Sequence, residues 1–171
     1  HDVTIASNWI FSQDTVDRDE TILSPQLMDS ARIFRTRSHA ITLLGLRFQS
    51  ESLSAGSGIL VADSAVRLQV NNCEIAGDYD TLRHPTTAIF MCPRGSEASL
   101  SFFQYQGDGN CGVPLFNVLG KIAIDRSSFR NRFRDGVLGV PFIRGAFDSA
   151  TVSNCYWERI AQGMQYSGNR F

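Results

Sequence analysis

The chain has 171 residues, of which 43% are hydrophobic and 19% are charged. This composition is that of a folded domain, because disordered chains are much poorer in aromatic and β-branched residues. Sixteen basic residues oppose seventeen acidic ones, so no overall positive field draws the protein to nucleic acid. The apolar runs are far shorter than the roughly 18 residues that cross a bilayer. We therefore expect no nucleic-acid partner and no membrane insertion.

A pattern of three apolar residues, separated by two and then by five positions, recurs six times along the chain. Such self-similarity is typical of solenoid proteins, in which each repeat forms one coil and stacks on its neighbours. Equivalent members of the triplets should then form interior columns. The triplets are Val3, Ile5 and Ile10; Ile41, Leu43 and Phe48; Val66, Leu68 and Cys73; Ala98, Leu100 and Tyr105; Ile122, Ile124 and Phe129; and Ala150, Val152 and Trp157.

A second strand-like segment follows each triplet and is bounded by Gly, Pro, Asn, Asp or Ser. No window of twelve or more residues keeps a 3.6-residue apolar period, so long helices are not expected, and only residues 24–33 suit a helical turn. Strands that recur without intervening helices predict a parallel β-solenoid. The second segments are residues 31–34, 59–61, 88–91, 115–118, 140–143 and 164–166.

Four asparagines fall where a coil must bend, and Asn tolerates the left-handed backbone conformation that such bends use. They are Asn71, Asn72, Asn131 and Asn154.

The coil pattern of residues 65–75, 121–129 and 150–157 resembles the right-handed parallel β-helix proteins of the pectin-lyase-like superfamily. The resemblance implies an all-β fold of about six coils, with residues 1–171 as a single domain. It does not select a function, because that superfamily includes polysaccharide lyases, hydrolases, epimerases, phage tailspikes and surface adhesins.

The segment between each triplet and its second strand varies most in length, and residues 12–30 contain the longest insertion. Insertions at one place in every coil project from one edge of a solenoid, which is often its binding face. We therefore expect a ridge of loops there, suited to an extended polar polymer.

The sharpest local cluster lies in residues 126–135, where four arginines are interleaved with phenylalanines. Guanidinium groups pair with carboxylates and phosphates, so the cluster suits an acidic glycan, although an ordinary exposed turn explains it equally well. The predicted ligand-binding residues are Arg126, Arg130, Arg132, Arg134 and Asp135.

Catalysis would need paired carboxylates, one acting as acid and one as nucleophile or base. The only candidates are loop residues, and their signal is weak because acidic turns also form for backbone reasons. The outward positions of the first strands contain a single acid, Asp125, which argues against a lyase-like site. The candidates are Asp78, Asp80, His84 and Asp108.

Cysteine and histidine show no spacing typical of a metal site, and no cofactor-binding motif is present. We expect neither a metal nor a cofactor. Cys92 and Cys111 flank a loop-bearing stretch, and the sequence leaves open whether they are bonded.

The leading hypothesis is a non-catalytic β-helix segment of a surface or virion-type protein or assembly subunit, which binds a glycan or protein through its loop ridge. Its location would be extracellular, at the cell surface or on a virion. The alternatives are a carbohydrate-active enzyme acting on an extended acidic polysaccharide, and a purely structural spacer. Because a solenoid exposes apolar interior at its ends, we expect further chain or a partner subunit to cover them.

Overall fold

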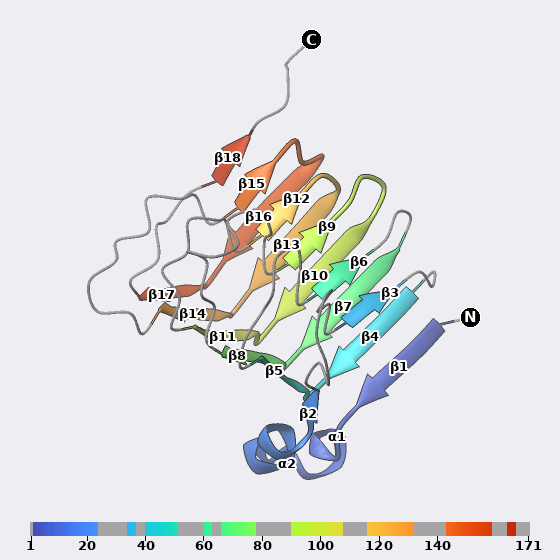
Figure 1. Ribbon diagram of the computed structural model, residues 1–171, viewed down its shortest axis with the longest axis vertical. Helices are drawn as coiled ribbons and strands as arrows, with labels where there is room; N and C mark the ends of the chain where they lie inside the picture. Colours follow the sequence, from blue (N-terminus) through green and yellow to red (C-terminus); the bar gives the residue numbers. More distant parts are fainter. Residues whose placement is uncertain are drawn as a thin grey trace.

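A computed structural model describes residues 2–23, 34–36, 40–50, 60–62, 66–77, 90–107, 116–131, 143–158 and 164–166. These residues form three six-stranded sheets, here named A, B and C, and all of the strand pairs are parallel (Figure 1).

Sheet A contains β1 (Asp2–Ala6), β4 (Ala40–Leu44), β7 (Arg67–Asn71), β10 (Glu97–Ser101), β13 (Lys121–Asp125) and β16 (Ser149–Ser153). Sheet B contains β2 (Ile22–Leu23), β5 (Arg47–Ser50), β8 (Glu74–Gly77), β11 (Gln104–Gly107), β14 (Ser128–Asn131) and β17 (Tyr156–Glu158). Sheet C contains β3 (Phe34–Thr36), β6 (Leu60–Ala62), β9 (Phe90–Cys92), β12 (Phe116–Val118), β15 (Ile143–Gly145) and β18 (Met164–Tyr166).

Consecutive strands enter sheets A, B and C in turn, and neighbours within each sheet are three strands apart in sequence. The prediction of a mostly β chain with stacked parallel strands is therefore confirmed. Four of the six predicted triplets span a strand of sheet A and the following strand of sheet B. Each predicted second segment overlaps or adjoins a strand of sheet C. The segments of variable length connect sheet B to sheet C, except that residues 12–30 begin earlier and contain β2 of sheet B.

The core is built from inward side chains that alternate with outward ones along each strand of sheet A. In β7 and β13 the second and fourth residues are buried while the first and third are exposed. Parallel pairing sets Leu100 beside Val70 on one side and Ile124 on the other, with Val152 following Ile124. Buried strands of a parallel sheet favour such branched aliphatic residues, because both neighbours in the column are also apolar.

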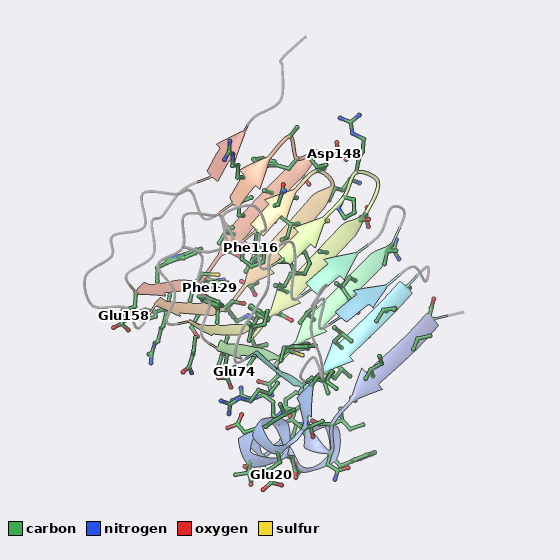
Figure 2. All side chains as sticks on the ribbon, in the orientation of Figure 1. Glu20, Glu74, Phe116, Phe129, Asp148 and Glu158 are labelled. Carbon is green, nitrogen blue, oxygen red and sulfur yellow. The ribbon has the colours of Figure 1, made fainter. Side chains whose placement is uncertain are left out.

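A second part of the core, on the side of sheet B, is aromatic. Phe129 stacks on Trp157 with ring centroids 4.9 Å apart, and its edge meets Phe116 of sheet C at 5.9 Å. Figure 2 shows Phe116 and Phe129 between the sheets. Aromatic pairs in these arrangements contribute about 0.5–1.5 kcal/mol beyond the burial of their area.

The predicted register of the third triplet is wrong by two residues. The structure pairs Leu68 with Ile41, Val70 with Leu43, and Ile75 with Phe48. The predicted members Val66 and Cys73 are also buried, but they lie before β7 and in the turn after it.

The first triplet also differs from its predicted structure at Ile10, which lies in helix α1 (Trp9–Ser12). Leu23 takes the expected place, opposite Phe48. A second helix, α2 (Thr15–Glu20), follows, and the Asp14 side chain caps it by accepting from the Val16 amide. Helix was expected only in residues 24–33, which lie outside the described residues.

The turn between sheets A and B has the same shape in five successive coils. One residue in each turn adopts a positive φ of 46° to 61°, and Asn72 and Asn154 confirm the predicted role of Asn. Asn71 and Asn131 instead end strands. The amides of the first four turn residues donate to the next coil, so hydrogen bonding continues around the corner. The five residues are Gly45, Asn72, Phe102, Arg126 and Asn154.

Truncating one inward side chain of sheet A tests whether the inward residues form a packed column. We expect Leu100→Ala to lower the free energy of unfolding by about 2–5 kcal/mol, because it removes buried methyl groups and leaves a cavity. The matched control is Ser99→Ala, on the exposed side of the same strand, which should change stability by no more than about 0.5 kcal/mol. Urea unfolding followed by circular dichroism measures both. A small loss for Leu100→Ala would contradict the assigned column.

Candidate functional site

Two of the predicted ligand-binding arginines are described: Arg126 lies in the turn between sheets A and B, and Arg130 lies nearby in β14 of sheet B. Their side chains are more than half exposed. The other three predicted residues, Arg132, Arg134 and Asp135, lie outside the described residues, so their place relative to this corner stays a prediction.

Arg126 lies over the ring of Phe102, with its guanidinium carbon 4.9 Å from the ring centroid. The two residues occupy equivalent turn positions in neighbouring coils, because the Phe102 amide donates to the Asp125 carbonyl just before Arg126. Phe102 is 46% exposed. A cation held on an exposed ring face gains stabilisation of about 0.5–1 kcal/mol.

Arg130 makes a second cation–π contact, from β14 to a residue of the following coil. Its guanidinium carbon lies 5.4 Å from the ring centroid of Tyr156, and its Nε lies 3.6 Å from Glu158. Tyr156 is 52% exposed. We name the set Phe102, Arg126, Arg130 and Tyr156 the corner patch.

Asp125 fixes the position of Arg126 within the corner patch. Its carboxylate accepts from Arg126 Nε at 2.7 Å, from Ser153 Oγ at 2.8 Å and from Asn154 Nδ2 at 2.9 Å. These donors, Arg126 foremost, lower the pKa of Asp125 to about 2. Asp125 is thus a hydrogen-bonded anion that links coils, and its pKa shift is opposite to that of a general acid. Glu97 of β10 is a further outward acid of sheet A.

Sequence reasoning missed the aromatic residues of the corner patch, because they lie in different coils from the arginines. Aligning the coils by register would have found them. In that alignment Phe102 falls beside Arg126, and Tyr156 falls opposite Ser128, two residues before Arg130.

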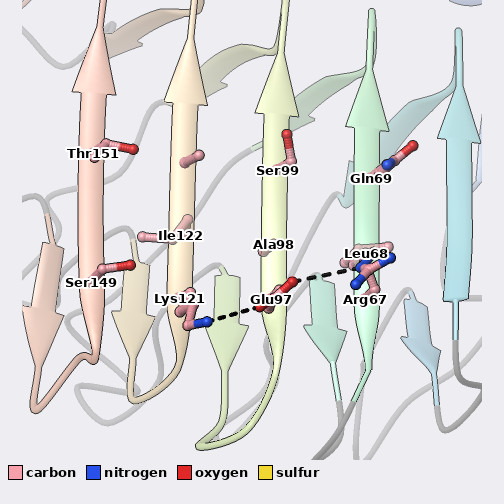
Figure 3. Close-up of a pocket in the computed structure, with 11 residues that line it drawn as sticks. Arg67, Leu68, Gln69, Glu97, Ala98, Ser99, Lys121, Ile122, Ser149 and Thr151 are labelled. Carbon is pink, nitrogen blue, oxygen red and sulfur yellow. Dashed lines mark hydrogen bonds and ion pairs between the residues drawn. The ribbon is translucent and has the colours of Figure 1, made fainter.

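A second feature is a shallow groove of about 360 Å³ on the outer face of sheet A (Figure 3). One outward row crosses it, in which Glu97 lies 3.5 Å from Arg67 and 3.0 Å from Lys121. Hydrogen bonding from Lys121 lowers the pKa of Glu97. A neighbouring row of Gln69, Ser99 and Thr151 adds short polar groups. Glu97 pairs with both cations of this row, just as Asp125 and Glu158 pair with the arginines of the corner patch. Unlike the corner patch, the groove has no aromatic ring among its described lining residues.

A third cluster is buried where α2 meets sheet B. Arg18 Nη2 lies 3.2 Å from Glu74 Oε2, and both side chains are about 95% buried. Arg18 also pairs with Asp19 at 2.7 Å. Within the described part of the chain, Arg18 Nη1 and Arg47 Nε have no hydrogen-bond partner. The ion pair joins the helix to β8, and its burial makes it a structural contact rather than an accessible site.

The described cysteines lack the properties of nucleophiles. Burial raises the pKa of Cys73 and that of Cys92 to about 11, so both thiols stay protonated at neutral pH. Cys92 is a free thiol in the structure, and Cys111 lies outside the described residues.

The weak catalytic candidates Asp78, Asp80, His84 and Asp108 all lie outside the described residues. Across the described ranges, no group of three His, Cys, Asp or Glu side chains is placed to hold a metal ion. Nor does any helix within those ranges have the length and hydropathy to span a membrane.

Comparison with protein-family models, with curated proteins and with solved structures finds no match for this chain. The resemblance to the pectin-lyase-like superfamily therefore stays a prediction, supported by the parallel stacked sheets alone.

The hydrogen bonds to Asp125 should appear in the pH dependence of stability. A carboxyl group has a pKa near 3.9 in the unfolded chain, so its ionised form stabilises the folded state above about pH 4. This contribution should be lost as the pH falls toward 2. We expect Asp125→Asn to reduce the drop in the urea midpoint between pH 4 and pH 2. The control is Asp148→Asn, which removes an exposed carboxylate elsewhere. The urea midpoint of this control should fall more between pH 4 and pH 2 than that of Asp125→Asn. An equal fall in the two variants would contradict the role of Asp125.

Proposed function

We propose that the chain is a right-handed parallel β-helix segment of about six coils that binds an acidic glycan without catalysing a reaction. The cyclic order of the strands through sheets A, B and C supports the β-helix, because one pass through the three sheets makes one coil. We place this segment in a surface or virion-type protein or assembly subunit, located extracellularly, at the cell surface or on a virion.

The single observation that carries the proposal is the corner patch. It combines two exposed guanidinium groups with two exposed aromatic rings on neighbouring coils. Sugar rings pack on aromatic faces, while uronate carboxylates form charge-assisted hydrogen bonds with arginine. Rigid strands and a repeated turn hold all four side chains, so little ordering is needed when a ligand binds.

The absence of catalysis is supported by the state of the described acids. Asp125 and Glu97 both have lowered pKa values and are held by cations, whereas a general acid needs a raised pKa. The alternative of a carbohydrate-active enzyme rests on loop residues outside the described ranges. It is tested by incubating the protein with polygalacturonate and measuring reducing ends and unsaturated uronates. Release of either product would contradict the proposed absence of catalysis.

Binding is tested with the double variant Arg126→Gln and Arg130→Gln. We expect its affinity for polygalacturonate to fall at least about tenfold, equivalent to about 1.4 kcal/mol, and its salt dependence to flatten. Calorimetric titration at two salt concentrations measures both, with neutral dextran as the comparison ligand.

The matched control is Arg94→Gln with Arg144→Gln, which removes two exposed arginines elsewhere and changes the net charge equally. It should bind almost as well as the unaltered protein. An equal loss of affinity in the two double variants would show that binding depends on overall charge. Unchanged affinity in the variant of Arg126 and Arg130 would contradict a role for the corner patch.

A further inference from the structure

Exposed apolar side chains are concentrated in the first coil. Nine large hydrophobic residues of the described part are exposed, and six of them lie within residues 3–22. Scattered exposed apolar residues are normal on a protein surface, but a concentrated group marks a surface that another molecule covers. The six are Val3, Ile5, Ile10, Phe11, Val16 and Ile22.

The exposure of Val3 and Ile5 follows from the position of β1 at the edge of sheet A (Figure 1). These two side chains are 42% and 37% exposed, whereas their partners in the next strand, Ile41 and Leu43, are 6% and 0% exposed. The inward row therefore has a neighbour on one side only.

The opposite edge of sheet A differs from β1. In β16 the inward residues Ala150 and Val152 are only partly exposed, and both pack against the core. Phe147, just before β16, packs there as well. The inward side chains are therefore more exposed to solvent at β1 than at β16.

The backbone of β1 also has a free side. The Ser7 amide donates to the Leu44 carbonyl at 3.1 Å, which shows that this residue faces β4. Successive residues of a strand direct their N–H and C=O groups to alternate sides, so Val3 and Ile5 also face β4. Asp2, Thr4 and Ala6 then direct theirs to the outer side, where no described strand pairs with β1.

We propose that β1 pairs with β1 of a second copy of this chain, in an antiparallel arrangement about a two-fold axis at Thr4. Thr4 then lies opposite Thr4 of the partner subunit, and the outward N–H and C=O groups of Asp2, Thr4 and Ala6 are all paired. Val3 lies opposite Ile5 of the partner subunit on the inward side. This inference is independent of glycan binding.

A second copy fits this edge because the edge is complementary to itself. The register places apolar residues opposite apolar residues and Asp2 opposite an alanine, so no like charges face each other. Two-fold dimers of this kind are the commonest symmetric assemblies, since one surface serves both subunits. Head-to-tail stacking would instead use the β16 edge, where Ala150 and Val152 are already partly covered.

Light scattering after size-exclusion chromatography tests the dimer across a range of protein concentrations. The unaltered chain should show twice its mass of 19.0 kDa, and Ile5→Lys should show the mass of a single chain. Leu119→Lys is the matched control, because Leu119 is 40% exposed but lies far from β1 in the sequence; it should remain a dimer. A single-chain mass for the unaltered protein at all concentrations, or assemblies larger than two chains, would overturn the proposal.

A cross-link tests the geometry with a change that should not disturb folding. Directly paired residues of antiparallel strands have Cα atoms about 5.5 Å apart, which a disulfide can span. Under mild oxidation, Thr4→Cys should give a covalent dimer on a non-reducing gel. Thr151→Cys, in the same outward row at the other edge of sheet A, should not. Equal cross-linking of the two variants, or none with Thr4→Cys, would contradict pairing at Thr4.

Discussion

Parallel pairing in a fixed register is the constraint on which the rest of this structure depends. It sets each inward side chain beside the equivalent side chain of the next strand, so Ala98, Ile122 and Ala150 form one column and Leu100, Ile124 and Val152 form another. A column of apolar residues excludes water only if its neighbours are also apolar. Each strand therefore depends on the strands beside it, and stability is shared along the stack.

The same register determines what the outer surface offers. Residues at equivalent outward positions lie one strand spacing apart, about 4.8 Å, and therefore interact across coils. The row through Arg67, Glu97 and Lys121 becomes a chain of ion pairs. At the corner, Arg126 reaches the ring of Phe102 in the preceding coil. Charge and aromatic rings that are scattered along the sequence thus become continuous surfaces.

The apolar triplets were enough to predict that the strands exist. They were not enough to predict which residues pair between neighbouring coils in every case. Val66, Leu68 and Val70 are all apolar at alternate positions, so a period of two fits equally well after a shift of two residues. The turns at Asn72 and Asn154 were predictable from residue type, whereas Phe102 and Arg126 adopt the same left-handed conformation without that signal. Arg126 and Arg130 were predicted as site residues, but their aromatic partners depend on the register between coils.

The buried pair of Arg18 and Glu74 has a consequence for how the chain comes apart. Arg18 belongs to the first coil and Glu74 to the third, so the contact spans the strand that lies between them. Peeling the first coil away would take Arg18 from the buried Glu74 carboxylate, and a buried charge that loses its partner costs several kcal/mol. The helix that contains Arg18 therefore links the first coil to the third. We expect the first three coils to unfold as one cooperative unit rather than one at a time.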